Sequence, residues 1–254
     1  MARESLVAQM QEYVWLQKWE IEPGLFTPGQ ADVELLLQRL GLPEDMTGLS
    51  VLDIGAFDGA ISFVCERRNA ARVVAQDVQM RSTIRLLRDY LGSKIEFFES
   101  SPYELDPAVI GQFDIVIFSG VLYHMRYPLL AIDRVREVAK DRVFVETHVA
   151  NINLSNPPPG FENVMFFYER DAINNDYSNW HGPTVSTVMA MFRSAGFSIE
   201  HRAQWGDRAG FHARVVPGPR PFLADDYIGH VAYHGVIELT PDEIAAQLPR
   251  RLKW

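Results

Sequence analysis

The sequence is poor in cysteine and has no long apolar run. Among its 254 residues Cys65 is the only cysteine, so neither an internal disulfide nor a cysteine metal cluster can form. No apolar run approaches the roughly 20 residues that cross a bilayer, and residues 1–13 lack the apolar stretch of a secretory signal. These absences predict a cytoplasmic protein with no membrane span and no metal site.

Positive charge is also in short supply. The chain has 24 Lys and Arg against 33 Asp and Glu, a formal net charge of −9. Proteins that bind nucleic acid attract phosphates through a basic surface, so nucleic acid is not the expected partner. The hydrophobic fraction of 47% and the charged fraction of 22% are typical of a folded globular chain. The sequence does not fix the oligomeric state and is compatible with a homo-oligomer.

Strand-like and helix-like segments alternate through the middle of the chain. This alternation predicts crossover units and a mainly parallel sheet. Two further strand candidates near the end of that region predict a closing antiparallel pair. The fold class expected is therefore α/β, a doubly wound and mainly parallel seven-stranded sheet with N- and C-terminal helical extensions. The strand candidates are residues 50–54, 72–77, 95–98, 113–118, 142–149, 197–204 and 211–218.

The flanking segments divide the chain into three parts. Residues 1–47 are predicted to form an N-terminal helical cap and loop, with helical spacing over 2–18 and 31–40. Residues 48–217 are the predicted core, with a lid for an acceptor at about 150–183. Residues 218–254 are a C-terminal extension, which contains a capping-box sequence in LTPDEIAAQL.

The first strong strand leads into a glycine-containing turn, VLDIGAFDG, at residues 51–59. Glycines there let the chain turn sharply and let a ligand approach the backbone, although an ordinary strand-to-helix turn has the same pattern. Asp77 ends the next strand, eighteen positions after Gly59. A carboxylate at that place in a nucleotide-binding α/β fold accepts both ribose hydroxyls. The two elements together indicate a nucleoside-containing cofactor.

The spacing within the turn separates two kinds of cofactor. An NAD site expects G-x-G-x-x-G, whereas this chain has Asp53-x-Gly55-x-x-x-Gly59. Over residues 48–148 the pattern resembles class I S-adenosylmethionine-dependent methyltransferases. The resemblance implies S-adenosyl-L-methionine as cofactor, with the glycines along its methionine part and Asp77 on its ribose. The cofactor-binding residues implied are Asp53, Gly55, Phe57, Gly59, Asp77, Val78, Ser101, Pro102 and Gly120.

Two positions depart from the usual pattern of that family. Phe57 stands where many members have a middle glycine, so the loop must pass a bulky ring. Pro102 stands where a backbone N–H often meets the adenine ring, and proline has no N–H to donate. The adenine is therefore expected to meet Ser101, Tyr103 or packing alone.

The run SGVLYHMRYP at residues 119–128 resembles the tRNA wobble-uridine carboxymethyltransferase-like subgroup and its small-molecule methyltransferase members. His124 is then a candidate general base, because a methyl acceptor often loses a proton as it attacks and imidazole titrates near neutrality. The alternative is that His124 fixes the loop by hydrogen bonding to backbone. Glu146, at the end of the fifth strand, is a second catalytic candidate, although it could instead cap neighbouring backbone.

A later element, Asn179, Trp180 and Pro183, also resembles this subgroup and is predicted to form an acceptor lid; a packed connector is the alternative. The substrate-binding residues expected are Trp19, Tyr123, Arg126, Asn179 and Trp180. The function predicted is S-adenosylmethionine-dependent methyl transfer to an oxygen or nitrogen of a small-molecule acceptor. The alternatives are a tRNA-modifying (carboxy)methyltransferase and a non-catalytic adenosylmethionine-binding homologue.

Overall fold

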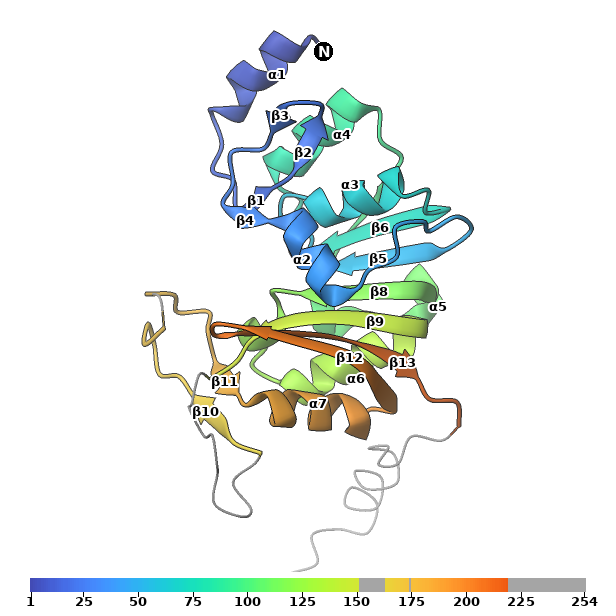
Figure 1. The fold of residues 1–254 in the computed structure, drawn as a ribbon, viewed down its shortest axis with the longest axis vertical. Helices are drawn as coiled ribbons and strands as arrows, with labels where there is room; N and C mark the ends of the chain where they lie inside the picture. The colour runs from blue at the N-terminus through green and yellow to red at the C-terminus, as the bar shows by residue number, and fades with distance from the viewer. Residues whose placement is uncertain (151–162, 174, 219–254) are drawn as a thin grey trace, which may run out of the picture. The chain divides into compact units, whose positions relative to one another are not determined.

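Seven strands form the central sheet, as the sequence predicts (Figure 1). The computed structural model describes residues 1–150, 163–173 and 175–218, and Met1–Gly218 form one unit. The order across the sheet is β12-β13-β9-β8-β5-β6-β7. Their bounds are β5 Ser50–Ile54, β6 Arg72–Asp77, β7 Glu96–Glu99, β8 Phe113–Ser119, β9 Ala139–His148, β12 Phe197–Trp205 and β13 Arg208–Val215.

The pairing directions fix where a ligand can bind. Strand β5 is parallel to both β6 and β8, β6 is parallel to β7, and β8 is parallel to β9. Strand β13 is antiparallel to β9 and β12, which confirms the predicted closing pair. The chain leaves β5 toward β6 on one side and later returns to β8 on the other. In open α/β sheets such a switch point leaves a crevice at the carboxyl ends of the strands.

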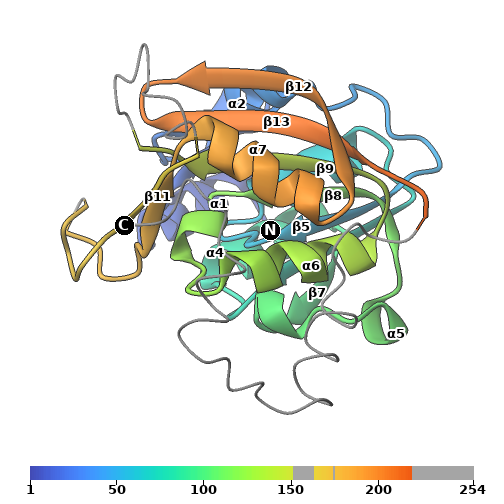
Figure 2. The same cartoon turned by 90° about the horizontal axis from the view of Figure 1, so that it is seen from below.

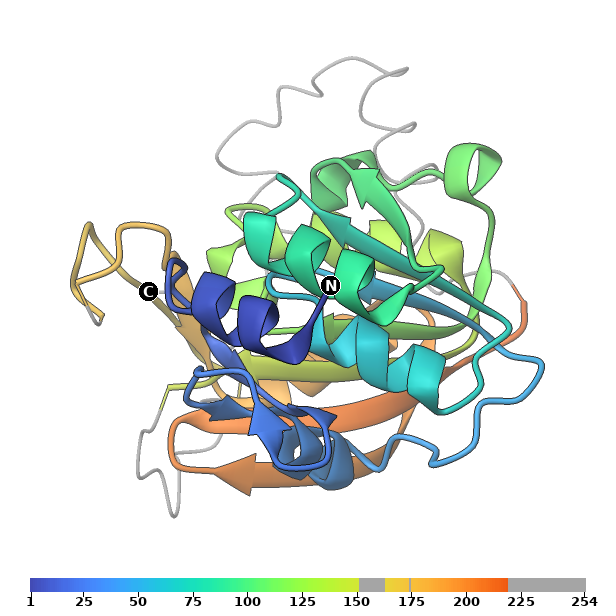
Figure 3. The same ribbon diagram turned by 90° about the horizontal axis from the view of Figure 1, so that it is seen from above.

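Helices cover both faces of the sheet, and each contributes to one of two hydrophobic clusters. The helices α2 Val33–Leu40, α3 Ala60–Arg67 and α4 Ser82–Leu91 pack on one face, the near face in Figure 3. The helices α5 Pro107–Ile110, α6 Pro128–Val138 and α7 Val185–Ser194 pack on the other, and α6 and α7 lie in front of the sheet in Figure 2. The doubly wound architecture is therefore confirmed.

The amino-terminal segment differs from the prediction of a helix over residues 2–18. Helix α1 spans only Arg3–Met10, and Gln17–Lys18 form strand β1, parallel to β4, Ala31–Asp32. A hairpin of β2, Glu20–Glu22, and β3, Leu25–Phe26, lies between them. The second predicted helix is present, but it begins at Val33, because the Asp32 side chain caps it by accepting from the Leu35 N–H.

Contacts with the glycine turn explain why helix α1 stops early. The N–H groups of Leu16 and Gln17 donate to Asp58 Oδ2 at 2.8 and 3.0 Å, and Asp58 belongs to the glycine turn. The Gln17 side chain in turn accepts from the Ala60 N–H at the start of α3, at 2.9 Å. These bonds hold residues 16–17 extended, so tertiary contacts override the local helical pattern.

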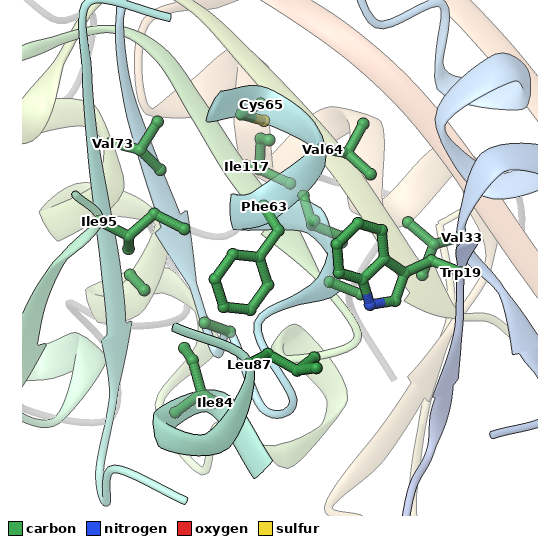
Figure 4. Close-up of a cluster of buried hydrophobic side chains, with 14 of the residues drawn as sticks. Trp19, Val33, Phe63, Val64, Cys65, Val73, Ile84, Leu87, Ile95 and Ile117 are labelled. Atoms are coloured by element: carbon green, nitrogen blue, oxygen red, sulfur yellow. The ribbon is translucent and has the colours of Figure 1, made fainter. Parts of the chain in front are cut away.

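The hydrophobic cluster beneath α3 contains Trp19, which the sequence placed in the acceptor site. Its indole is 2% exposed and stacks on the Phe63 ring, with centroids 5.6 Å apart (Figure 4). The Arg67 guanidinium lies 4.7 Å from the centroid of the same ring. Burial between a core ring and a cation leaves Trp19 no surface for an acceptor, so that prediction is wrong.

Two predicted features lie wholly or partly outside the described residues. The acceptor lid predicted at about 150–183 is described only in part, where β10, Met165–Phe167, pairs in antiparallel fashion with β11, His181–Pro183. The capping-box segment of the C-terminal extension falls in 219–254, which is not described. Within the part of the chain that is described, no helix is both long and apolar enough to span a bilayer.

Candidate functional site

A cavity of about 1120 Å³ opens at the carboxyl ends of β5, β6, β8 and β9. This volume is slightly above the roughly 300–1,000 Å³ of ordinary ligand sites, so the cavity can take a nucleoside cofactor and a small acceptor together. Ten of the residues predicted from the sequence line it: Gly55, Phe57, Asp77, Val78, Pro102, Gly120, Tyr123, His124, Glu146 and Asn179. Six do not: Trp19, Asp53, Gly59, Ser101, Arg126 and Trp180.

The glycine turn lies against the end of β6. The N–H groups of Gly55 and Ala56 both donate to the Gln76 carbonyl, at 2.8 and 3.0 Å. Gly55 has φ +73°, and a Cβ there would lie 2.3 Å from the Val121 Cγ2. A side chain at Gly55 would therefore clash as well as strain the backbone.

Asp77 joins the two loops that form the cofactor half of the cavity. Its Oδ2 accepts from the Phe57 N–H at 2.9 Å, and its Oδ1 accepts from the Val78 N–H at 2.7 Å. Each carboxylate oxygen has a second lone pair, so Asp77 can still accept two hydroxyl donors. The carboxylate is thus held in place by backbone donors while keeping the capacity that a ribose requires.

Three predicted cofactor contacts have structural positions instead. Asp53 is 1% exposed and accepts from the Ser62 hydroxyl at 2.6 Å, and burial raises the pKa of Asp53 to about 7. Gly59 precedes α3, and a Cβ there would lie 2.6 Å from Ile84. Ser101 caps the 3₁₀ turn Pro102–Glu104. None reaches the cavity, so the prediction that they contact a cofactor is not supported.

His124 ends the 3₁₀ turn Leu122–His124 at the mouth of β8, and two polar residues fix its ring. The Ser178 hydroxyl donates to Asp176 Oδ1 at 2.5 Å, so its oxygen accepts from the His124 Nδ1–H at 2.9 Å. The Nε2 lone pair then has no partner among the described residues. Burial lowers the pKa of His124, which keeps the ring neutral near pH 7. Nδ1 also lies 3.3 Å from the Ser178 carbonyl, which is the backbone contact of the alternative prediction. A neutral imidazole held in this way leaves Nε2 chemically able to accept a proton.

Glu146, the other catalytic candidate, is engaged in an ion pair. Its two oxygens accept from Arg208 Nε and from Arg208 Nη2, the latter at 2.8 Å, and the Ser119 hydroxyl adds a contact of 3.2 Å. Glu146 is 4% exposed. A buried carboxylate that already holds these donors serves best as an anchor for the guanidinium, so the geometry does not favour Glu146 as the base. The Arg208 guanidinium lies 4.8 Å from the Tyr123 ring centroid.

A second histidine, His148, lines the same cavity but has both nitrogens engaged. Its Nδ1 lies 3.3 Å from Asp207 Oδ2, and its Nε2 lies 2.9 Å from the Tyr168 hydroxyl. Gly182 makes room for that hydroxyl, because a Cβ there would lie 1.9 Å from the Tyr168 oxygen. Burial lowers the pKa of His148, so the neutral ring accepts the Tyr168 O–H. This bond connects the segment carrying β10 to the end of β9.

The lid residues divide between the cavity and the outer surface. Asn179 is buried, lines the cavity and donates from Nδ2 to the Ile173 carbonyl at 3.2 Å. Trp180 lies outside the cavity. Its backbone N–H donates to the Tyr123 carbonyl at 2.9 Å, and its ring lies 5.0 Å from the Arg126 guanidinium. Trp180 and Arg126 stack on each other, so the structure gives no support to acceptor contacts from these two.

Several cavity residues carry no pattern that the sequence could reveal. Arg208 follows a tight turn between two strands, and Asp176 and Ser178 lie in an irregular polar segment. The alternation of strands β12 and β13 could have placed Arg208 near the sheet end, but not its partner. The described residues contain no group of three His, Cys, Asp or Glu side chains able to hold a metal ion.

Solved structures with the same architecture identify the fold. The N-terminal domain of EvdMO1, crystallised in the presence of SAH and D-fucose, has a TM-score of 0.62 at 18% identity over 86% of this chain and 98% of that one. The chain has the class I methyltransferase fold. The same fold is found in the 1,6-didemethyltoxoflavin-N1-methyltransferase of Burkholderia thailandensis, with its substrate and S-adenosylhomocysteine bound, at TM-score 0.54, 17% identity and 72% and 76% coverage.

A cyclase has the same fold as well. The [4+2]-cyclase SpnF has a TM-score of 0.58 at 17% identity, covering 85% of this chain and 93% of that one.

A protein of Methanocaldococcus jannaschii assigned provisionally as a protein N5-glutamine methyltransferase is 30% identical over 105 residues, 40% of this chain. The chain spans about half, 49%, of that relative's length. No family model matches the sequence.

Proposed function

We propose that the protein is an S-adenosylmethionine-dependent methyltransferase that acts on an oxygen or nitrogen of a small-molecule acceptor. One observation carries the proposal. A single cavity contains both the Asp77 carboxylate beside the glycine turn and a neutral His124 whose Nε2 lone pair has no partner in the described part of the chain. The first element suits a nucleoside cofactor, and the second suits removal of a proton from an attacking acceptor.

The proposed chemistry assigns one task to each half of the cavity. The bound cofactor supplies an activated methyl group on its sulfonium. Asp77 accepts the ribose hydroxyls and so orients that methyl. His124 Nε2 takes the proton from the acceptor O–H or N–H as the acceptor attacks, so that a C–O or C–N bond forms, the C–S bond breaks and a thioether remains. Asp176, through Ser178, stabilises the imidazolium that results.

The acceptor half of the cavity favours a polar substrate. Its walls include the side chains of Asp176, Ser178, Asn179 and Asp207. Such groups hydrogen-bond hydroxyls and amines, and the buried Asn179 Oδ1 has no hydrogen-bond partner among the described residues, so a wholly apolar substrate would leave it unpaired. The related structure crystallised with D-fucose and the methyltransferase bound to its toxoflavin precursor support small molecules as acceptors in this fold. Because the same fold is found in a cyclase, the fold does not establish the reaction.

Cofactor binding is the first test, and calorimetry with S-adenosylhomocysteine measures it directly. We expect a dissociation constant in the micromolar range, roughly −8 kcal/mol, and at least a tenfold loss in Asp77→Ala. Asp89→Ala is the matched control, because Asp89 is an exposed carboxylate on α4 outside the cavity. An intact chain that binds neither S-adenosylmethionine nor S-adenosylhomocysteine would overturn the proposal.

The role of His124 is tested once a panel of hydroxylated and amine compounds has yielded an acceptor by release of S-adenosylhomocysteine. His124→Gln should lower kcat by roughly 10²–10⁴ while leaving S-adenosylhomocysteine affinity unchanged. Ser178→Ala should cost less, because the ring keeps its Nε2 but loses its orientation. A wild-type kcat in His124→Gln would show that positioning alone drives the transfer.

Transfer to tRNA is the rival that the sequence resemblance raises. Net charge −9 disfavours it, because phosphate binding depends on a basic surface. Filter binding to bulk tRNA at moderate salt separates the two. Tight, salt-sensitive retention would replace the small-molecule acceptor with tRNA, and weak retention is the result that we expect.

A further inference from the structure

Phe57 has a backbone conformation that its residue type disfavours. Its φ is +53°, in the left-handed region where a bulky side chain is strained. Asn69, another left-handed residue, is of a type that tolerates this region, so it needs no special explanation. A bulky residue in this conformation persists where the surroundings hold it there, and such positions concentrate at ligand sites.

The Phe57 ring is in contact with Arg81, a cation in the loop that follows β6. The guanidinium carbon of Arg81 lies 3.5 Å from the ring centroid, a close cation–π contact. Both side chains line the cavity. The Arg81 backbone carbonyl accepts from the Arg85 N–H. The Arg81 guanidinium has no ion pair or hydrogen bond with any other described residue, so its N–H donors stay available while one face covers the ring.

The stack lies beside the carboxylate assigned to the ribose. The Phe57 N–H donates to Asp77 Oδ2, and Arg81 follows Asp77 by four residues. Val78, between them in sequence, is 66% exposed and lines the same part of the cavity. The strained residue, the cation and the apolar side chain therefore belong to the two loops that meet at one carboxylate, which is where the nucleoside half of a cofactor would lie.

We propose that Phe57 and Arg81 form a clamp that recognises the adenosine half of the cofactor, with the ring and the guanidinium covering the nucleoside that Asp77 holds. The inference rests on the proposed function. A glycine at position 57 would relieve the backbone but would remove the ring. On this assignment the strain at Phe57 is retained because the ring must lie next to Asp77.

Affinities of two ligands in matched variants test the clamp. The probes are S-adenosylhomocysteine and 5′-methylthioadenosine, which keeps the nucleoside but lacks the amino-acid part. Phe57→Ala and Arg81→Ala should each weaken both ligands about tenfold, which is 1.4 kcal/mol. Because the two side chains act as one surface, the double variant should lose little more than either single variant.

A second pair of variants separates strain from recognition. Phe57→Gly and Phe57→Ala both lack the ring, so they should bind the two ligands equally weakly. Phe57→Gly should nevertheless melt about 2 °C above Phe57→Ala, because glycine adopts positive φ without a Cβ clash. Asn69→Gly is the control, since Asn69 has positive φ but lies outside the cavity and its substitution should leave both affinities unchanged.

The outcomes distinguish the clamp from the proposed function itself. If the wild-type chain binds neither ligand, the proposed function fails. If the wild type binds both and the Phe57 and Arg81 variants bind equally well, the clamp is wrong and the function stands. If Arg81→Ala weakens S-adenosylhomocysteine but not 5′-methylthioadenosine, Arg81 contacts the amino-acid half, which also overturns the clamp.

Discussion

Replacing Asp53 with asparagine should make the protein more stable, and increasingly so as the pH rises. Asp53 lies in β5, is 1% exposed and accepts from the Ser62 hydroxyl, and burial raises its pKa to about 7 from the ordinary aspartate value of 3.8. Between these two pH values the folded state binds the proton and the unfolded state does not. Stability therefore falls as the pH rises through the folded pKa. Asparagine has the same shape, accepts the same hydrogen bond and does not titrate.

The magnitude follows from the shift. A difference of 7 − 3.8 = 3.2 pKa units corresponds to about 4 kcal/mol once both states are ionised. About 1.4 kcal/mol of this loss of stability is expected between pH 6 and pH 8. For a folded unit of this length, that loss corresponds to about 3–6 °C in melting temperature. Partial or full burial also lowers the pKa of His124, His148 and His181, which acts in the opposite direction, but these histidines are common to both proteins and cancel in the difference.

The assay is urea or thermal unfolding of wild type and Asp53→Asn at pH 6, 7 and 8, with Asp89→Asn as the control for an exposed carboxylate. The stability gap between Asp53→Asn and wild type should widen by about 1.4 kcal/mol from pH 6 to pH 8. A constant gap would show that Asp53 ionises normally in the folded state. S-adenosylhomocysteine affinity should change by less than about threefold, since a large loss would place Asp53 in the cofactor site after all.

Substitutions in two residue pairs test contacts in and beside the cavity. Gly182→Ala should lower the free energy of unfolding by about 1 kcal/mol, because a Cβ at 1.9 Å displaces the Tyr168 hydroxyl from its hydrogen bond to His148. Tyr168→Phe lacks that hydroxyl and should have the same effect. Equal melting temperatures for wild type and both variants would contradict this. Arg208→Met should lower the free energy of unfolding in urea by about 3–5 kcal/mol, because it leaves the buried Glu146 carboxylate unpaired. Adding Glu146→Leu should restore most of that stability. A double variant no more stable than Arg208→Met would contradict the anchoring role of the pair.

The parts of the fold that the sequence predicted are those encoded by local patterns. Apolar runs of strand length, broken by helical ones, predicted all seven strands, and two adjacent runs near the end predicted the antiparallel pair. The helix over residues 2–18 failed for a physical reason. The Asp58 carboxylate, more than 40 residues away, accepts from the Leu16 and Gln17 N–H groups, and no periodicity within the segment can report such a bond.

In the candidate site, too, local patterns predicted some residues, while tertiary contacts decided the others. The glycine turn and Asp77 could be placed because chain direction and strand order bring them to one sheet edge. Which residues of the turn line the cavity could not be predicted, since Asp53 and Gly55 are two positions apart and only Gly55 lines it. The stack of Arg81 on Phe57 depends on a backbone conformation that the sequence pattern does not encode.

The two cavity histidines show most clearly why sequence position cannot assign a base. Both lie at the carboxyl end of a strand, both are anchored at Nδ1 near an acid, and burial lowers the pKa of both. They differ at Nε2. The Tyr168 hydroxyl occupies that atom in His148, and no described residue occupies it in His124. Because only an uncommitted lone pair can take a proton from an acceptor, the proposed function assigns the proton transfer to His124, whereas the bonds of His148 connect the β10–β11 segment to the end of β9.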